Sequence, residues 1–513
     1  MSDGLFLFNP LPWERDISGP VAHHVVNPRG VPGDETAGRH FQDRDRERRD
    51  TSGFTDSEDR ASFFDLDSYY LPSTTVPGYG WTTVSQEDLL ALENRPFDER
   101  STVETTRHRL TFDREHGGVT SWYDRQLNHE WVDLSADYPL GGFVHERVVD
   151  DDTDRPRKRL FDYGPEVDDR HAAIAGITDS PRGFQPDWHA RRTGPERVTR
   201  HRVYDLPEGY EVHQRLATPQ LETDVTLRVT IPERDDTLIF DARWDMGLRT
   251  HPEATYLAFP LALDSPTPRI DVGGQAMEPG ADQLAGSAHD YYTVQHWADL
   301  SDRERGVTFG CPLNPMVQFG DFHFAENRQT FELERPLFLG WVTNNYWDTN
   351  FRAHQPGRVH ARYHLSPHEA FDEAAAHRAG MEATHTEPLA QTRAERSVDD
   401  PFLTPDGQLL DLPEAPVLVT HVRPVDADTG IFHPGIETES DRDDDILVSL
   451  RNASDDATRV AITPGDIAVV AAARTDPTGM QALDELETQS GGVEFRLDGR
   501  ETATVRLNVV PRE

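Results

Sequence analysis

Cysteine and lysine are almost absent from this chain, and long apolar runs are missing altogether. Among 513 residues there is one cysteine, Cys311, and one lysine, Lys158. A lone cysteine cannot close a disulfide within the chain, so an oxidising compartment gains no support. No stretch of about 18 consecutive apolar residues could span a membrane, and no basic region precedes a cleavable hydrophobic segment. We therefore predict a cytoplasmic protein that does not bind membranes.

Positive charge is also scarce. The chain has 51 Lys plus Arg against 92 Asp plus Glu, which gives a formal net charge of −41. Because phosphate recognition needs clustered positive charge, nucleic acid is not an expected partner. A surface this acidic repels itself less when salt screens it, which indicates a high-salt cytosol. Acidic disorder is the alternative, but nine Trp, 24 Phe and many alternating apolar runs favour packed cores.

Apolar residues alternate with polar ones over many short segments. The clearest examples are 225–231, 238–244, 446–450 and 505–509. A period of two with one apolar face is typical of antiparallel strands that pack as sandwiches. We therefore predict a mainly β chain with few helices.

One helix is predicted near the end of the large β region. Ser366 is a candidate N-cap, Pro367 suits the first helical position, and Glu369 lies three residues after the cap. The pattern predicts a helix that begins at this signature and ends near Gly380.

Breaks in the strand pattern predict the domain organisation. Charged stretches that are poor in apolar residues, at 33–60, 150–159 and 437–445, are expected to be solvated loops. We expect a small N-terminal β domain, a large β domain, a linker and a C-terminal β-sandwich, at residues 1–90, 91–386, 387–401 and 402–513.

Four segments of the chain resemble one known family. Residues 6–15 read Phe-Leu-Phe-Asn-Pro-Leu-Pro-Trp-Glu-Arg, and 93–131 contains a Glu-Asn pair and two strands around a Gly-Gly turn. Further matches lie at 282–297 and 344–351. In order and spacing these segments resemble the β-rich C-terminal half of glycoside hydrolase family 38 α-mannosidases. The turn by itself predicts a β-hairpin, since adjacent glycines adopt positive φ at little steric cost.

The resemblance implies both a fold and a neighbour. It implies that the large domain is a galactose mutarotase-like antiparallel supersandwich, flanked by smaller β-sandwich domains. In the family, a catalytic α/β barrel precedes the segment that residues 6–15 resemble, and it carries a zinc ion, an Asp nucleophile and an acid/base carboxylate. Because only Met1 to Leu5 precede that segment, we expect the barrel and its zinc on a separate chain.

The catalytic residues of that family are not found in this sequence. The family's zinc site begins with a His-x-Asp pair, and none of the 23 histidines stands two residues before an aspartate. Zinc needs several ligands fixed at about 2.0–2.2 Å, and no cluster has recognisable ligand spacing. Gly-x-Ser-x-Gly, Walker and dinucleotide motifs are absent too. We predict no catalytic residue, no metal ligand and no cofactor in this chain.

The best candidates for sugar contact lie in the Asn-Asn-Tyr-Trp-Asp-Thr-Asn segment at 344–350. Flat aromatic faces can stack on a pyranose ring, and amide or carboxylate groups can bind its hydroxyls. The alternative is that the aromatic side chains fill the core and the polar ones satisfy local backbone. The predicted contact residues are Asn345, Tyr346, Trp347, Asp348 and Asn350.

A second group of polar and aromatic residues lies at 290–297. Strand alternation places Tyr291 and Gln295 on one face and separates them from Asp290. We predict sugar contacts for these three residues, whereas His296 is expected to be structural, because a neutral imidazole tolerates partial burial.

The leading hypothesis for function combines these observations. The chain is predicted to be the non-catalytic β half of a family 38-like α-mannosidase, supporting mannoside hydrolysis with a catalytic barrel on a separate chain. A stand-alone carbohydrate-binding protein is the alternative. A mutarotase-like sugar isomerase is a weaker one, since it needs an acid and a base at the anomeric centre and no such pair can be named.

Salt dependence tests the interpretation of the charge. Unscreened like charges repel, so the fold should loosen as salt falls below molar levels. We expect the melting temperature of the purified chain, measured by scanning calorimetry, to be lower at about 0.1 M than at about 3 M KCl. Equal melting temperatures at the two concentrations would show that the acidic surface is not an adaptation to salt.

Overall fold

The fold is known from a computed structural model that describes most of the chain. The described residues are 4–27, 40–41, 62–91, 96–150, 188–221, 223–323, 326, 328–346, 354–385, 389–393, 406–425, 445–479 and 481–512. They form two compact units, one made of 1–95 and 385–513 and the other of 96–384. The predicted charged loops lie mostly outside the described residues.

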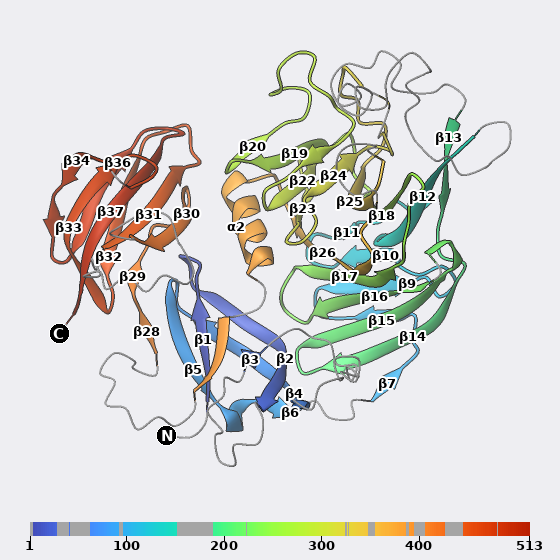
Figure 1. The fold of residues 1–513 in the computed structure, drawn as a ribbon, viewed down its shortest axis with the longest axis horizontal. Helices are drawn as coiled ribbons and strands as arrows, with labels where there is room; N and C mark the ends of the chain where they lie inside the picture. Colours follow the sequence, from blue (N-terminus) through green and yellow to red (C-terminus); the bar gives the residue numbers. More distant parts are fainter. Residues whose placement is uncertain are drawn as a thin grey trace. The chain divides into compact units, whose positions relative to one another are not determined.

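The prediction of a mainly β chain is confirmed. The described residues form six sheets with antiparallel pairing and a single α-helix, α2 (Glu373–Thr384) (Figure 1). Two 3₁₀ turns, η2 (Gln86–Asp88) and η3 (Pro219–Leu221), complete the regular structure of these residues. None of the described helices is long and apolar enough to cross a membrane.

Two large sheets build the unit made of 96–384. The ten-stranded sheet has the order β20 (Gln275–Met277), β19 (Thr267–Val272), β22 (Trp297–Ser301), β23 (Gly306–Gly310), β26 (Gly357–His368), β17 (Leu238–Met246), β16 (Thr223–Pro232), β15 (Gly209–Thr218), β14 (Arg197–Leu206) and β7 (Phe97–Asp98). The six-stranded sheet has the order β13 (Trp188–Thr193), β12 (Gly142–Asp150), β18 (Glu253–Pro260), β25 (Leu337–Asn344), β24 (Met316–Phe319) and β21 (Tyr292–Thr293).

One hydrophobic core joins these two sheets, as expected of a supersandwich. In an antiparallel strand alternate side chains point to opposite faces, so β16 and β17 place their predicted apolar positions in this core. Phe309 of the ten-stranded sheet stacks on Phe338 of the six-stranded sheet, with ring centroids 4.0 Å apart. Phe259 meets both rings at centroid distances of 5.6 and 5.8 Å. Such aromatic pairs add about 0.5–1.5 kcal/mol each beyond the area they bury.

A smaller sheet carries the predicted hairpin. Its strands are β11 (His129–Glu130), β10 (Val119–Asp124), β9 (His108–Phe112) and β8 (Thr102–Glu104). Gly117 and Gly118 in the turn between β9 and β10 have φ angles of 87° and 89°. A Cβ on Gly117 would lie 2.4 Å from Leu216 Cδ2, so the turn also needs glycine for its close approach to β15. The hairpin prediction is confirmed.

The predicted helix exists, but its start was wrong, and it ends at Thr384 rather than near Gly380. Ser366–His368 is the end of β26, where Thr308 of β23 lies opposite Ser366. The helix begins at Glu373, and Asp372 is its cap, because Asp372 Oδ1 accepts a hydrogen bond of 2.7 Å from the backbone N–H of Ala375. Strand pairing therefore overrides the capping signature at Ser366.

The unit made of 1–95 and 385–513 contains three sheets. The eight-stranded sheet has the order β28 (Gly407–Gln408), β5 (Gly80–Ser85), β1 (Gly4–Asn9), β27 (Leu389–Arg393), β3 (His40–Phe41), β2 (Arg15–Asn27), β4 (Ser62–Val76) and β6 (Leu90–Ala91). The C-terminal sandwich pairs β29 (Leu410–Asp411), β32 (Thr458–Pro464), β36 (Gly492–Leu497) and β35 (Thr488–Gln489) with β30 (Val417–Pro424), β31 (Asp445–Asn452), β37 (Thr502–Pro511), β33 (Ile467–Thr475) and β34 (Ala482–Leu486). Residues 389–393, inside the predicted linker 387–401, form the strand β27 beside β1.

The segment at 6–15 has a structural role in this unit. The fully buried Asn9 amide donates to the carbonyls of Trp13 and Pro77 at 2.8 and 3.1 Å, and its Oδ1 accepts from Leu11 N at 3.1 Å. These bonds satisfy the backbone of a turn that contains two prolines. A Cβ on Gly78 would lie 2.0 Å from the carbonyl oxygen of Pro12, so glycine is required where these two segments of the chain cross.

The buried His108 side chain should make the stability of the hairpin depend on pH. Burial lowers the pKa of His108 to about 4, and its Nδ1 accepts a 3.2 Å hydrogen bond from Trp122 Nε1. The unfolded chain takes up a proton below about pH 6.5. The neutral His108 side chain therefore makes its full contribution to the free energy of unfolding above pH 6.5. This contribution is lost as the pH falls towards 4. Between pH 7 and about pH 4.5 the free energy of unfolding should fall by roughly 2.5 kcal/mol through this group.

Urea unfolding at the two pH values measures this loss. The His108→Gln variant keeps an acceptor but cannot titrate, so its free energy of unfolding should depend less on pH. His116, in the adjacent turn, is exposed, and His116→Gln is the matched control that should retain the wild-type dependence. Parallel pH profiles for wild type and His108→Gln would contradict the assignment.

Candidate functional site

The candidate site lies on the face of the six-stranded sheet that points away from the shared core. We call this the outward face. Phe143 and Leu257 point into the core, so their neighbours Val144 and Tyr256 point outward. A second buried cluster covers the outward face, and it contains four large aromatic side chains, Tyr256, Phe322, Trp341 and Tyr346. The sheet is thus buried on both sides.

A carboxylate lies in the middle of this apolar layer. Glu146 of β12 is 4% exposed, and Arg192 lies directly opposite it on β13. Arg192 Nε donates to Glu146 Oε2 at 2.6 Å. The hydroxyl of Tyr256 donates to Glu146 Oε1 at 3.2 Å, and the hydroxyl of Tyr346 donates to the same oxygen. Hydrogen bonds to a charged group are stronger than neutral ones, so Glu146 fixes three side chains at once.

The pKa values of these neighbours follow from burial and from the Glu146 charge. Burial and then the negative charge of Glu146 raise the pKa of Tyr256 and of Tyr346 well above the ordinary value. Both phenols therefore keep their protons as donors to the carboxylate. Burial alone would lower the pKa of Arg192, but the charge and hydrogen bond of Glu146 outweigh it and raise the pKa. The guanidinium stays charged.

Aromatic rings surround this carboxylate. Tyr256 and Trp341, which lie opposite each other on β18 and β25, stack with centroids 6.0 Å apart. Phe322 meets Tyr256 edge to face at 4.9 Å, and Arg192 lies 4.4 Å over the Phe322 ring. This guanidinium–ring contact is a cation–π interaction. We call Glu146, Arg192, Tyr256, Phe322, Trp341 and Tyr346, with Tyr138 and Tyr291, the outer-face cluster.

The rim of the outer-face cluster and the Arg192 side chain are open to solvent, whereas the centre of the cluster is buried. Tyr256, Trp341 and Tyr346 are at most 2% exposed. Tyr138 and Tyr291 are half-buried, and they pack edge to face on Phe322 and Trp341 at centroid distances of 5.8 and 5.3 Å. A ligand that approaches this face therefore meets these two tyrosine rings and the Arg192 side chain.

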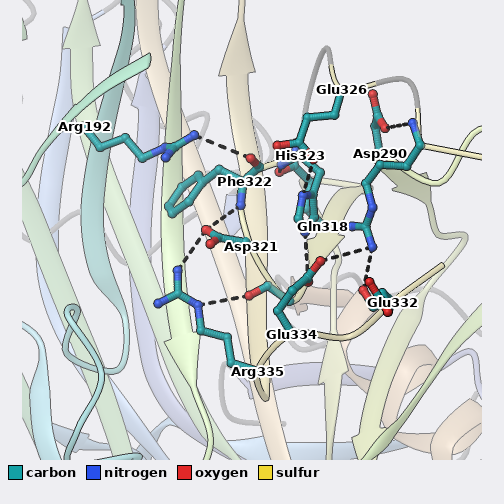
Figure 2. Close-up of polar contacts among 12 residues, drawn as sticks. Arg192, Asp290, Gln318, Asp321, Phe322, His323, Glu326, Glu332, Glu334 and Arg335 are labelled. Atoms are coloured by element: carbon teal, nitrogen blue, oxygen red, sulfur yellow. Dashed lines mark hydrogen bonds and ion pairs between the residues drawn. The ribbon is translucent and has the colours of Figure 1, made fainter. Parts of the chain in front are cut away.

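A polar network holds the segment that carries Phe322 (Figure 2). His323 lies between two carboxylates, with Nδ1 2.7 Å from Glu326 Oε2 and Nε2 3.0 Å from Glu334 Oε2. Arg335 binds Asp321 Oδ1 at 2.8 Å, and the same Oδ1 accepts from the backbone N–H of Phe322. These bonds fix the position of the Phe322 ring over β18.

Glycine is needed inside this network. Gly320 has a φ of +87°, and an added Cβ would lie 2.3 Å from Glu334 Oε2. The positive φ strains any other residue, and an added Cβ would displace the Glu334 carboxylate that His323 contacts. This end of β24 can turn back tightly enough for Glu334 to reach His323.

The structure places the described members of the predicted sugar-contact residues in different positions. Tyr346 and Tyr291 both contact Trp341, with centroid distances of 6.1 and 5.3 Å. Asp290 is buried, and its Oδ1 accepts from the backbone N–H of Arg328 at 2.8 Å (Figure 2).

Two more of the predicted residues lie elsewhere, and the rest are not described. Asn345 Oδ1 accepts from the backbone N–H of Glu253 at 2.7 Å, at the start of β18. Gln295 is exposed, and its backbone N–H donates to the carbonyl of Asp271 beside β19. The remaining predicted contacts, Trp347, Asp348 and Asn350, lie outside the described residues.

Sequence reasoning missed most of the outer-face cluster. Glu146, Tyr256 and Trp341 come from three strands that are far apart in the chain and become neighbours only through pairing. One local signal was available. The charged triplet His145-Glu146-Arg147 interrupts an apolar strand, and charged groups within a buried strand need partners.

The described residues contain one group with the spacing of metal ligands. Asp271, His296 and His377 offer ligand atoms that lie within 4.8 Å of one another. They come from β19, the segment before β22 and α2, and so from the ten-stranded side of this unit. No His-x-Asp pair contributes to the group.

Two solved structures share the fold of this chain. An alpha-mannosidase from Enterococcus faecalis V583 matches with a TM-score of 0.60 at 12% identity, covering 98% of this chain and 56% of that one. A protein in glycosyl hydrolase family 38 from Enterococcus faecalis matches with a TM-score of 0.57 at 12% identity, covering 98% of this chain and 58% of that one. The chain thus spans somewhat more than half the length of both. The predicted resemblance is confirmed for the fold.

The other comparisons do not assign the chain to a family. A galactose mutarotase-like protein from Lactobacillus casei ATCC 334 aligns with 52% of this chain and 99% of its own length, at 10% identity and a TM-score of 0.28. That score is too low to support an argument. No protein-family model matches the chain, and no curated protein matches its sequence. Membership of the mannosidase family stays a prediction.

The Glu146–Arg192 pair gives a stability prediction. Glu146 is buried whereas the Arg192 side chain is 30% exposed, so removing the arginine leaves a buried charge without its cation. We expect Arg192→Ala to lower the free energy of unfolding by on the order of 3 kcal/mol. Arg197 pairs with Glu196 at the surface, with side chains 65% and 59% exposed, so Arg197→Ala should change it by less than about 1 kcal/mol. Both variants remove one positive charge, which equalises the effect on overall repulsion.

Urea titration in high salt compares the two variants directly. Equal losses for Arg192→Ala and Arg197→Ala would mean that the Glu146–Arg192 pair does not organise the outward face.

Proposed function

We propose that this chain is the non-catalytic β part of a family 38-like α-mannosidase. In this role it supports mannoside hydrolysis together with a catalytic barrel on a separate chain. The observation that carries the proposal is the likeness in fold to two Enterococcus faecalis structures over 98% of this chain. The absence of any His-x-Asp pair from the sequence favours a supporting rather than a catalytic role.

The outer-face cluster is the proposed place of carbohydrate contact in this unit. Its rim offers the half-buried rings of Tyr138 and Tyr291, which can stack on the apolar face of a pyranose. Arg192 is 30% exposed at its side chain and can donate to a hydroxyl while it remains paired with Glu146. Aromatic platforms with a few convergent polar groups are the usual composition of ligand sites. The zinc and the nucleophile are proposed to reside on the partner.

Joint purification tests the partnership. A tagged chain is isolated in high salt, and the complex is assayed with an aryl α-mannoside. A permanent partner should bury on the order of 2,000 Å² or more. We expect activity in the complex that disappears on chelation of zinc and is absent from the chain alone. Hydrolysis by the partner-free chain, or a monodisperse monomer from native cells that never carries mannosidase activity, would refute the proposal.

A stand-alone carbohydrate-binding protein is the second candidate. It is favoured by the outer-face cluster, whose eight described side chains all come from the unit made of 96–384. This candidate differs from the first in what the isolated chain does. It predicts measurable sugar binding without any partner.

Calorimetric titration with a manno-oligosaccharide tests the role of the rim. If Tyr291 is a contact residue, Tyr291→Ala should weaken binding by about 1–2 kcal/mol. Tyr204 is a half-buried tyrosine on β14 that packs on Phe97, and Tyr204→Ala is the matched control with unchanged binding. Equal affinities for the two variants would remove Tyr291 from the site. Binding without a partner would favour the second candidate.

A further inference from the structure

A second cluster of polar side chains lies where α2 meets the ten-stranded sheet. Asp271 is in β19, His296 immediately precedes β22, and His377 is in α2. Their ligand atoms lie within 4.8 Å of one another, and His296 Nδ1 is 2.9 Å from Asp271 Oδ2. The His296 and His377 rings meet edge to face, with centroids 5.9 Å apart. Nothing in the proposed mannosidase role uses these residues.

The backbone around this cluster is fixed by hydrogen bonds. The carbonyl of Asp271 accepts from Gln295 N at 3.0 Å, and the carbonyl of His296 accepts from Cys311 N at 2.8 Å. The N–H of Gly274 donates to Asp271 Oδ1 at 3.1 Å. This bond orients the carboxylate so that Oδ2 faces His296. Two of the three ligands are therefore held in place before any ion arrives.

Close packing of the helix brings the third ligand to the other two. A Cβ on Gly380 of α2 would lie 2.7 Å from Trp297 Cδ1 and 3.1 Å from His296 Cβ. Glycine at this position lets the helix approach the strand, and His377 lies one turn earlier on the same helix. A larger residue at position 380 would push α2 away from β22. Glycine at this position therefore allows His377 to lie close to His296.

The charge of Asp271 needs a cation. The residue is fully buried, and in the part of the chain that the structure describes no arginine forms an ion pair with it. Two other buried carboxylates of this unit have arginine partners, since Glu146 pairs with Arg192 and Asp124 with Arg107. An ionised carboxylate in an apolar interior is costly unless a positive charge compensates it. Beside Asp271 lie two imidazoles, which can bind a cation together with the carboxylate.

Asp299 shows what a fully satisfied His–Asp pair looks like in the same sheet. His368 Nε2 lies 2.8 Å from Asp299 Oδ2, and the hydroxyls of Ser301 and Thr308 donate to the two carboxylate oxygens at 2.6 and 2.8 Å. Burial would lower the pKa of His368, but Asp299 raises it above the ordinary value. This pair has no second histidine. It provides a natural control for the cluster at Asp271.

We propose that Asp271, His296 and His377 bind one divalent transition-metal ion of the zinc class. Two imidazole nitrogens and one carboxylate oxygen are a ligand set that such ions favour over magnesium or calcium, which prefer all-oxygen sites. Ligands of a tetrahedral zinc lie about 3.3 Å apart, a separation that small side-chain rotations can reach from the present positions. Water completes the coordination on the partly exposed His296 side. The ion fastens α2 to β19 and β22.

Zinc retention by the full-length chain tests this proposal. The protein is stripped with EDTA, incubated with zinc in excess magnesium to block diffuse binding by surface carboxylates, gel-filtered and analysed by elemental mass spectrometry. About one zinc per chain is expected, since one site is proposed. His377→Gln and Asp271→Asn should lose the retained zinc, and His368→Gln should keep it. Equal retention by all four proteins would overturn the proposal.

Cobalt(II) spectroscopy keeps the proposal testable even if a variant fails to fold. Wild-type protein loaded with cobalt should show the intense visible bands of a four-coordinate ion, and added zinc should abolish them. Zinc should also raise the melting temperature of wild type but not of His377→Gln, because binding to the folded state alone stabilises it. A weak octahedral spectrum in the wild type, or no zinc-dependent shift, would contradict the site.

Discussion

The outward face of the six-stranded sheet depends on one buried carboxylate. Both faces of this sheet are covered, and on its outward face Glu146 places a carboxylate within a layer of aromatic and aliphatic side chains. An ionised glutamate in that layer is stable only if donors surround it. Arg192, Tyr256 and Tyr346 supply them. The positions of the neighbouring rings then follow from the positions of these three donors.

The remaining elements of the site are arranged around this constraint. Arg192 contacts Phe322 through its guanidinium, so the ion pair and the aromatic layer are one assembly. The segment after β24 contributes a polar network of His323, Glu334 and Arg335, which holds Phe322 in this assembly. These contacts are charge-assisted hydrogen bonds, which are stronger than hydrogen bonds between neutral groups. The surface proposed for carbohydrate contact is thus a face held by these bonds, with tyrosines at its rim.

Much of the fold was predictable from the sequence because the alternation of apolar residues is a local signal. The strands at 225–231 and 238–244 lie where the period of two placed them. The helix start was wrong because Ser366 combines a good capping pattern with a position in β26, and sheet pairing decided between them. Propensity is a weak prior against such tertiary contacts.

The site was less predictable, since its members meet only through the topology of the sheet. Tyr291 and Tyr346 were recognised from segments that resemble a known family, and both contact Trp341. Glu146 and Trp341 have no motif of their own, and their separation in the chain hides the contact. Asp271 and His377 likewise come together only because a helix packs closely on a distant strand.

Amide hydrogen exchange on the protein saturated with a manno-oligosaccharide, with any catalytic partner still bound, tests most directly whether the outward face meets carbohydrate. The account predicts slower exchange on adding sugar in peptides that cover Tyr138, Tyr291 and residues 320–323, with no change in peptides from β14 and β15. Protection confined to other parts of the chain at saturation, with these peptides unchanged, would contradict it.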